Sequence, residues 1–347
     1  MDATEPVGAR GAVTPSISLP EPRSRQGKPT SKGHADAVYH SVSLVVSLVL
    51  VVTLAAIVAV LLSTAWPAIN QLGLGIITGS VWNPSAGIEG IFGGLPFVVG
   101  TLLTTAVALL IAVPVSLAIA ILLGEYAPRP VAAVLGVVVE VAAGVPTIVF
   151  GAWALLVLVP FLANTIEPAI APALGWLPPL DPNNSPVGIS GFGMLTAGLV
   201  LAAMVFPTIV AVTRTSLRAT PPELREASLG IGATTWETAT RVVLREARGI
   251  IGAVVLACGR ALGETMAVVY VIGGQPRLPQ SLFDEGSTLS AQLFTQVYGG
   301  GAITGTLNAG ALYELGLVLL LFSLLTSLAG RLLTRRLTGA TLVGAGR

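Results

Sequence analysis

The amino-acid sequence contains six apolar stretches, each long enough to form a helix that crosses a lipid bilayer. Such a helix needs about 20 predominantly apolar residues. The stretches cover approximately residues 41–65, 97–123, 131–161, 190–213, 249–273 and 309–330. Because 53% of the 347 residues are hydrophobic and only 10% are charged, the composition excludes a water-soluble domain of this length. The sequence therefore predicts an all-α membrane protein with six transmembrane helices.

The third stretch, 131–161, is longer than one straight span requires and contains Pro146 and Pro160. A proline inside a helix has no backbone N–H to donate, and its ring collides with the preceding turn. We therefore expect this helix to be kinked or broken at the prolines.

The basic residues are distributed unevenly between the two sides of the predicted spans. Of 18 Lys and Arg residues, sixteen fall in the segments of one side, Arg277 falls on the other side, and Arg260 lies within the fifth stretch. Short cytoplasmic loops of membrane proteins carry such an excess of basic residues. The distribution predicts that both chain termini are cytoplasmic.

Side chains that support metal or thiol chemistry are scarce. The chain has one cysteine, Cys258, and two histidines, His34 and His40, both of which lie in the N-terminal region. These residues exclude an internal disulfide framework and a cysteine-based metal site. A formal net charge of +1 gives no reason to expect a nucleic-acid partner. We expect no cofactor on this chain.

The segment 218–249, between the fourth and fifth stretches, has the signals of a helical hairpin. Thr220 followed by prolines and Glu223 matches a capping box, in which a hydroxyl and a carboxylate satisfy free N–H groups at the start of a helix. We expect this first helix to end near Leu229.

A glycine turn follows the first helix of this segment. Gly230 and Gly232 supply the backbone freedom that a helix stop requires, and Thr234 with Glu237 repeats the capping box at the start of a second helix. A solvated loop with amphipathic helices is the simpler alternative. Two capping signals around one turn favour a defined shape.

The fifth stretch places two opposite charges in an apolar segment, "VVLACGRALGETMAVVYVIGG". A charge at the bilayer centre costs about 2.5 to 3.5 kcal/mol, and Arg260 and Glu264 are spaced so that they meet on one helix. Gly259 and Gly263 form an adjacent small-residue pair that allows a close helix approach. Two roles stay open: a self-neutralised pair that fixes helix packing, or an arginine that binds a passing anion with Glu264 as its counter-ion.

Three further polar residues are candidates for the transport pathway. Thr147 and Thr208 each follow a proline at an expected kink, where hydroxyls and freed carbonyls can face a pathway. Glu140, in the third stretch, is either a second polar contact in the path or a residue near the cytoplasmic end that is held by Arg129 or a neighbouring helix.

The cytoplasmic segment "EASLGIGATTWETATRVVL" resembles the loop shared by permease subunits of ABC importers. Glu226, Ala227 and Gly232 match the pattern of that loop, and Thr234 directly follows its turn. The resemblance implies that these four residues shape a coupling helix that docks on a cytoplasmic ATPase. The chain has no phosphate-binding glycine loop followed by Lys-Ser/Thr, so ATP and Mg²⁺ are expected on a separate ATPase chain, and this chain is expected not to be an enzyme.

Two residues depart from that loop pattern. Ser228 replaces a second alanine, and Arg245 stands where the family usually has a proline. The absence of that proline predicts an exit into the fifth span that is more continuously helical than in the family.

The stretches "LLGEYAP", "AAGVPTIVFGAWAL" and "GRALGETMAVVYVIG" resemble, in the same order, stretches in the permeases of bacterial phosphate importers. The "GETMAV" ending and the long outer loops resemble the PstC-type half of these permeases more than the PstA-type half. The resemblance implies a MetI-like type I ABC importer core, located in the cytoplasmic membrane. It assigns Arg260 to the anion in transit and Glu264 to its counter-ion.

The same resemblance implies four partners and a domain organisation. The partners are a PstA-type permease, a PstB-type ATPase dimer, a PstS-type extracytoplasmic binding protein and inorganic phosphate, with membrane lipid around the spans. The expected segments are a disordered cytoplasmic tail (1–38), a first helix with its outer loop (39–92), the permease core (93–336) and a C-terminal tail (337–347). Sulfate, molybdate and tungstate permeases, and a proton-coupled carrier, are the alternatives.

Overall fold

The computed structural model describes residues 34–85, 90–181, 186, 188–247, 249–299 and 306–342. The chain divides into two compact units, Met1–Ala55 and Ala56–Arg347. Described residues of the first unit belong to the N-terminal part of helix α1 (His34–Leu72). Of the predicted disordered tail (1–38), residues 1–33 lie outside the described residues. At the other end, helix α15 (Leu307–Leu342) continues into the predicted C-terminal tail.

The described residues contain five helices that are long and apolar enough to cross a membrane, which confirms a helical multi-pass membrane protein. They cover Asp36–Leu72, Leu95–Tyr126, Thr147–Ala173, Met194–Arg218 and Leu307–Thr334. The fifth predicted span falls short because its helix, α12 (Gly249–Gly263), has 15 residues. The predicted count of six full-length spans is therefore not reproduced.

The third predicted span is broken at Pro146, one of its two prolines. Helix α4 (Arg129–Ala143) ends before Pro146, which adopts an extended conformation (φ −57°, ψ 136°) and precedes α5 (Thr147–Trp153). At Pro160 the chain stays helical in the short α6 (Val159–Phe161). Flanking π-helical turns accommodate the missing N–H there.

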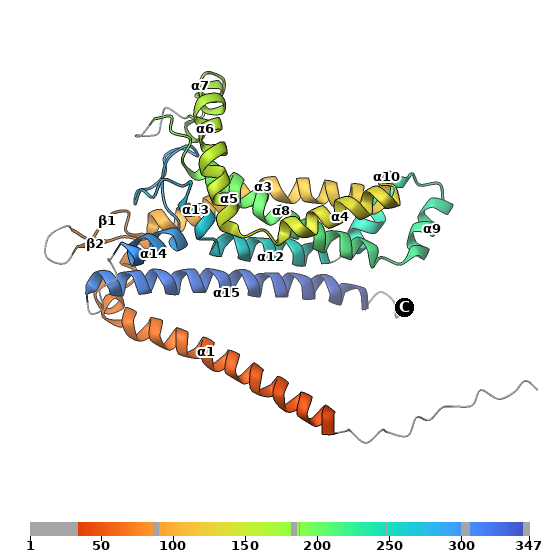
Figure 1. Cartoon of the computed structure of the whole chain (residues 1–347), viewed down its shortest axis with the longest axis horizontal. Helices are drawn as coiled ribbons and strands as arrows, with labels where there is room; N and C mark the ends of the chain where they lie inside the picture. Colours follow the sequence, from red (N-terminus) through yellow and green to blue (C-terminus); the bar gives the residue numbers. More distant parts are fainter. Residues whose placement is uncertain are drawn as a thin grey trace, which may run out of the picture. The chain divides into compact units, whose positions relative to one another are not determined.

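The segment from α5 onward is a series of short helical elements. After α5 these are η2 (Ala154–Leu158), α6, η3 (Leu162–Ile166), α7 (Glu167–Leu174) and the 3-10 turn η4 (Pro178–Leu180). Figure 1 shows this segment leaving the neighbouring helices at a steep angle.

Four helices of the second unit form its core. α3 (Leu95–Ile121) packs along α8 (Met194–Arg218), and α12 packs against both α8 and α15; these helices run side by side in Figure 1. The contacts are made by small residues such as Ala108, Ala112, Ala197 and Ala257, all almost fully buried. Small side chains let helix backbones approach closely where the lipid offers no hydrophobic driving force.

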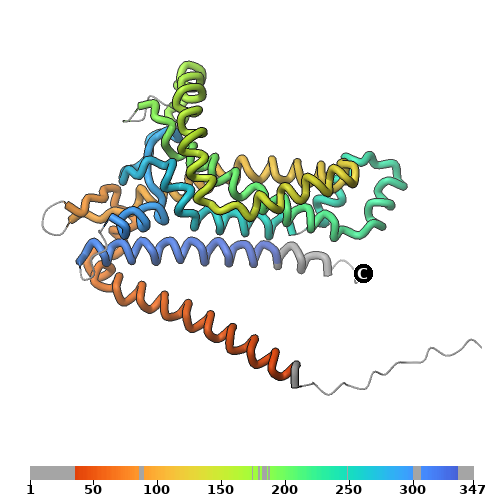
Figure 2. Tube along the Cα trace, in the orientation of Figure 1, coloured from red at the N-terminus to blue at the C-terminus, as the bar shows by residue number. Residues whose placement is uncertain are grey.

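The two ends of this helix bundle carry different structures (Figure 2). One end holds α2 (Gly75–Thr78), the antiparallel pair of β1 (Trp82–Asn83) and β2 (Ile91–Phe92), α13 (Met266–Val269) and α14 (Leu289–Tyr298). The opposite end holds α9 (Pro222–Gly230), α10 (Thr235–Glu237), η6 (Thr238–Val243) and α11 (Leu244–Glu246), next to η1 (Leu122–Tyr126) at the end of α3.

The segment between α13 and α14 is irregular, and its second part, residues 283–288, is buried. The backbone N–H of Leu289 donates to Thr101 Oγ1 of α3 at 2.9 Å, and Arg277 Nη2 lies 2.7 Å from Asp284 Oδ1. At Gly100 an added Cβ would lie 2.1 Å from the Ser287 carbonyl oxygen. These contacts fix the segment against α3.

Candidate functional site

The charged pair predicted in the fifth span lies where its helix stops. Helix α12 ends at Gly263, and the Glu264 N–H reaches only the Ala261 carbonyl, at 3.4 Å. Glu264 Oε1 instead accepts the N–H of Ala267 at 3.2 Å, and the Glu264 carbonyl accepts the Ser290 hydroxyl at 2.6 Å. Glu264 thus satisfies a free N–H at the start of α13, as carboxylates do at helix N-termini.

Arg260 is directed to a different partner. Its Nη1 donates to Thr208 Oγ1 of α8 at 3.4 Å, and both residues are half-buried. Within the described residues Arg260 forms no ion pair with Glu264, which corrects the expected direct pairing. The i, i+4 relation requires the helix to continue through both residues, and here it ends between them.

The remaining predicted pathway residues lie apart. Thr147 is the first residue of α5, which packs closely on α13, because an added Cβ at Gly151 would lie 2.9 Å from the Ala267 Cα. Glu140 is exposed on α4 and lines a small pocket of about 30 Å³ with Arg214 and Arg218 of α8. That pocket is nearer the α9 end of the bundle than Thr208 is, so Glu140 and Arg260 do not share one site.

Arg260 also lines a groove of about 820 Å³ between α12 and α15. An added Cβ at Gly252, Gly259 or Gly263 would meet nothing within 4 Å. In the described chain the small-residue face of α12 is therefore open. The lining residues are Gly252, Val255, Leu256, Gly259, Arg260, Ser323, Ser327, Gly330, Arg331 and Thr334.

Sequence reasoning missed the contribution of α15 to this groove. Ser323, Ser327 and Arg331 follow one another at intervals of four residues, so they share one helix face. That spacing was visible in the sequence, but nothing in it indicated that the face lies beside Arg260.

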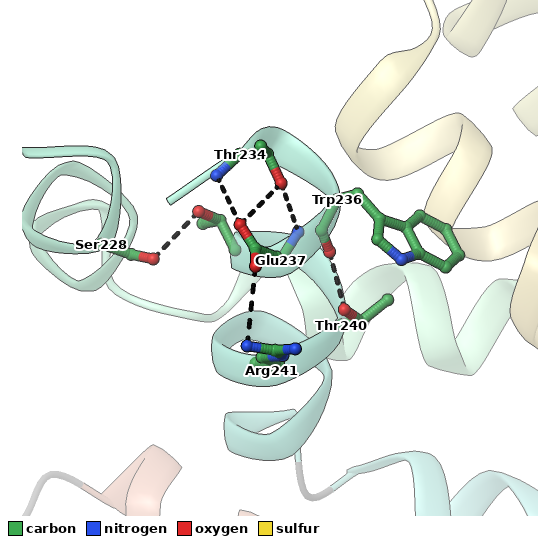
Figure 3. A network of polar contacts seen from close by, with 7 residues as sticks. Ser228, Thr234, Trp236, Glu237, Thr240 and Arg241 are labelled. Carbon is green, nitrogen blue, oxygen red and sulfur yellow. Dashed lines mark hydrogen bonds and ion pairs between the residues drawn. The ribbon is translucent and has the colours of Figure 1, made fainter. Parts of the chain in front are cut away.

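The predicted turn between α9 and α10 is present. Helix α9 ends at Gly230. Gly232 has φ +92°, a backbone conformation that residues with a Cβ rarely adopt. Figure 3 shows the second capping box, in which the Glu237 N–H donates to Thr234 Oγ1 at 3.2 Å and the Thr234 N–H donates to Glu237 Oε2 at 3.0 Å. Thr234 and Glu237 therefore start the second helix as predicted.

The prediction of a capping box at the start of α9 was wrong. The residue before α9 is Pro221, and it makes no side-chain capping bond. Thr220 Oγ1 is buried without a hydrogen-bond partner, and the Thr220 carbonyl accepts Arg225 Nη1 at 2.7 Å. Pro221 and Pro222 at the start of α9 have no backbone N–H. Fewer free N–H groups therefore need a hydrogen-bond partner from a capping side chain.

The exit from the loop into α12 is interrupted, although the sequence predicted an exit more continuously helical than in the family. Helix α11 ends at Glu246, and Ala247 has φ −74° and ψ 69°. An added Cβ at Gly249 would lie 1.9 Å from Ser216 Oγ of α8. The chain turns here because α12 must start in close contact with α8.

The exposed surface of the loop combines predicted and unpredicted residues. Glu226 and Ala227 are exposed on α9, while Ser228 is buried and shares a 2.9 Å hydrogen bond with Thr238. The two most exposed large apolar side chains of the loop are Ile231, which is 88% exposed, and Trp236, which is 62% exposed. In Figure 3 the Trp236 indole points away from the hydrogen-bonded residues. Contiguous exposed apolar patches are typical of partner surfaces, so these two side chains are candidates for such a contact.

Arg225 ties this loop to the bundle. Its Nη2 donates to Glu125 Oε1 of η1 at 3.0 Å and to the Leu217 carbonyl of α8 at 2.7 Å, while Nη1 donates to the Thr220 carbonyl at 2.7 Å. The side chain thus joins α9 to the ends of α3 and α8. Sequence reasoning did not single out Arg225 or Glu125.

The Thr234–Glu237 box also changes the acidity of its carboxylate. The backbone N–H of Thr234 and its hydroxyl both donate to Glu237 and hold the pKa of Glu237 below its ordinary value, with Arg241 adding a smaller effect in the same direction. These hydrogen bonds stabilise the ionised form.

Comparisons with known proteins agree with this architecture. Residues 112–339 match the family described as "Binding-protein-dependent transport system inner membrane component". The chain is 38% identical over 312 residues to the phosphate transport system permease protein PstC of Mesorhizobium japonicum, with 88% of this chain and 92% of the relative covered. It is 40% identical over 295 residues to PstC 1 of Mycobacterium tuberculosis, with 82% of this chain and 84% of the relative covered.

The fold is similar to that of a solved ABC transporter. The chain matches a structure of the MetNI methionine ABC transporter in an inward-facing conformation with a TM-score of 0.51 and 19% identity, over 70% of this chain and 95% of that chain. The predicted MetI-like core is therefore confirmed as a fold. With 38% identity across most of both chains, the protein belongs to the binding-protein-dependent transport permeases and, among them, to the family of PstC proteins.

Proposed function

We propose that this chain is the permease subunit of an ATP-driven importer that moves inorganic phosphate across the bacterial cytoplasmic membrane by alternating access. The observation that carries the proposal is the position of Arg260. Its guanidinium lies within an apolar bundle, is held by a neutral hydroxyl rather than by a carboxylate, and borders an open groove. A guanidinium offers forked donors that suit a phosphate oxyanion.

The contact with Thr208 favours a binding role for Arg260 over a packing role. A packing role calls for a buried counter-charge, because an unpaired charge is costly inside a membrane. Glu264 is engaged with the start of α13, so Arg260 keeps most of its donors for a ligand. In this arrangement Glu264 fixes the helix break, and its charge near Arg260 weakens anion binding enough to allow release.

The loop of α9, Gly232 and α10 is the proposed docking element for the ATPase. Glu226, Ala227, Gly232 and Thr234 shape it, and the exposed Ile231 and Trp236 provide the apolar contact. We place this end of the bundle, and both chain termini, in the cytoplasm because the basic residues gather there. ATP and Mg²⁺ then belong to a PstB-type ATPase dimer, and closure of that dimer switches the path.

The other proposed partners complete the importer. A PstA-type permease would lie opposite the open face of α12, so that the groove lined by Gly252, Gly259 and Arg260 borders the path between the two permeases. A PstS-type binding protein would deliver phosphate at the end that holds β1, β2 and α14. Transport of another oxyanion and proton-coupled transport are the rival functions.

Uptake by the reconstituted complex tests the function. Labelled phosphate should enter vesicles only with ATP, and excess sulfate, molybdate or tungstate should leave uptake largely unchanged. ATP-independent uptake would reject the importer, and competition by another oxyanion would reassign the cargo.

Substitution of Arg260 tests the site separately. Arg260→Gln should lower uptake by about two orders of magnitude, since a charged hydrogen bond to the anion is lost, while membrane abundance stays normal. Arg260→Lys keeps the positive charge but lacks the paired N–H donors of a guanidinium, and it should retain part of the uptake. Normal uptake by Arg260→Gln would remove Arg260 from the path.

A further inference from the structure

The groove between α12 and α15 contains a second guanidinium, that of Arg331. Along the bundle, Arg331 of α15 lies closer to the α9 end than Arg260 of α12 does. An added Cβ at Gly330 would lie 2.2 Å from Val255 Cγ1, so this part of α15 packs at the level of Val255, five residues before Arg260 in α12. At 1.5 Å per residue, Arg331 lies about 7 Å further along the bundle than Arg260.

Arg331 has no carboxylate partner in the part of the chain that the structure describes. None of the described groove-lining residues is acidic. Neither Arg260 nor Arg331 forms an ion pair within the described residues. Both therefore contribute positive charge to one groove, and low-dielectric walls strengthen the field of such charges.

The two groove serines show a second unusual feature. Serine and threonine in apolar helices commonly satisfy their hydroxyl on the carbonyl one turn back. On α15 itself, Thr326 donates to the Phe322 carbonyl at 2.8 Å and Thr334 donates to the Gly330 carbonyl at 2.9 Å. Among the described contacts, Ser323 and Ser327 make no such bond, so their hydroxyls are available to a ligand in the groove.

We propose that the α12–α15 groove is a second anion-binding position, in which Arg331, Ser327 and Ser323 receive the transported oxyanion after Arg260. This inference rests on the proposed function and extends it with a route: the anion passes from Arg260 toward the cytoplasmic end of α15. Two positions of moderate affinity suit release better than a single tight one, as in other permeation paths. The ligand class is a tetrahedral oxyanion, held by a guanidinium and two hydroxyls.

Cysteine labelling tests the electrostatics of the groove. Cys258 is the only cysteine of the chain, so Cys258→Ala provides a background for Ser327→Cys, with Leu328→Cys as the matched neighbour outside the groove lining. The assembled complex in inside-out vesicles is treated with anionic or cationic methanethiosulfonates, each rate being normalised to a free thiol. Ser327→Cys should prefer the anionic reagent by about tenfold, and adding Arg331→Gln should abolish that preference. No preference, or one that survives Arg331→Gln, overturns the proposal.

Protection by phosphate identifies the occupant. In nanodiscs of phosphatidylcholine alone, inorganic phosphate should slow the labelling of Ser327→Cys at least about threefold and leave that of Leu328→Cys unchanged. Slowing that appears only when phosphatidylglycerol is added, with no effect of phosphate, would assign the groove to lipid headgroups and overturn the proposal.

Transport measurements separate this proposal from the proposed function. Arg331→Gln should lower phosphate uptake about tenfold, Arg331→Lys less, and Arg129→Gln, an exposed arginine of α4 outside the groove, should not change it. If the unmodified complex takes up phosphate and Arg331→Gln does so equally well, only the groove proposal fails. If the complex takes up no phosphate but another oxyanion protects Ser327→Cys, the groove stands and the phosphate assignment fails.

Discussion

Arg225 of α9 and Glu125 of η1 form an ion pair with 3.0 Å between Nη2 and Oε1, at a site where both side chains are largely buried. The same guanidinium binds the Leu217 and Thr220 carbonyls. One side chain therefore connects the loop of α9 and α10 to the ends of α3 and α8. A force applied to α9 by an ATPase would reach the bundle through this connection.

The ion pair predicts uncoupling when either partner is removed. Arg225→Ala and Glu125→Ala should each reduce the amount of phosphate imported per ATP hydrolysed. A double-mutant cycle on thermal stability should give a coupling energy of about 1 kcal/mol or more, since the two residues share one hydrogen-bond network. Arg241→Ala is the control, because Arg241 is 76% exposed and 3.6 Å from Glu237 and should show little coupling. Additive effects at Arg225 and Glu125 would contradict the connection.

The glycine turn predicts different outcomes for two nearby glycines. Gly232 has φ +92°, whereas Gly230 does not have a positive φ, and an added Cβ meets nothing within 4 Å at either residue. Gly232→Ala should therefore strain the turn by about 1 kcal/mol, and Gly232→Asp should leave the protein in the membrane but abolish stimulated ATP hydrolysis. Gly230→Ala should hydrolyse ATP normally. Undiminished hydrolysis by Gly232→Asp would reject the coupling role of the turn.

The exposed apolar side chains predict the contact with the ATPase. Trp236→Ala should weaken binding of the ATPase to the permease pair by about 30-fold or more, as truncation of a central aromatic residue does in protein interfaces. Affinity measured by surface binding in nanodiscs checks this. Tyr298, a still more exposed aromatic residue on α14 at the other end of the bundle, provides the control: Tyr298→Ala should bind the ATPase normally.

The contact between α3 and the segment before α14 predicts intolerance of a single methyl group. Gly100→Ala would place a Cβ 2.1 Å from the Ser287 carbonyl oxygen, while Gly124→Ala meets only Leu217 Cδ1 at 3.5 Å. Gly100→Ala should destabilise the protein by about 1 to 3 kcal/mol through overpacking, whereas Gly124→Ala should be close to neutral. Thermal unfolding in detergent compares the two, and equal melting temperatures would show that the segment does not pack as described.

The lowered pKa of Glu237 predicts an acid-sensitive loop. Because the folded-state pKa lies below the ordinary glutamate value, the stabilisation by the ionised carboxylate is complete above that ordinary value. It is lost as the pH falls through the lowered folded pKa. The rate of hydrogen exchange of residues 230–246, corrected for intrinsic rates, should therefore rise as the pH falls below the ordinary glutamate pKa. Glu237→Gln keeps an acceptor for the Thr234 N–H and should remove this pH dependence.

The sequence by itself determined the features that depend on local chemistry and on the bilayer. Apolar length and the low charge predicted a helical membrane protein, Pro146 predicted the break in the third span, and Thr234 with Glu237 predicted the start of the second loop helix. Each of these follows from the backbone groups of a few neighbouring residues or from the thickness of the membrane.

Only the tertiary structure decided which side chains meet. The spacing of Arg260 and Glu264 indicated a pair on one helix, but α12 stops at Gly263 and the packing of Ser290 holds the break. Arg260 therefore meets Thr208, 52 residues earlier in the chain, and Arg225 meets Glu125, 100 residues earlier. Such contacts arise from how helices pack, and the period of a sequence pattern carries no information about the partner across the interface.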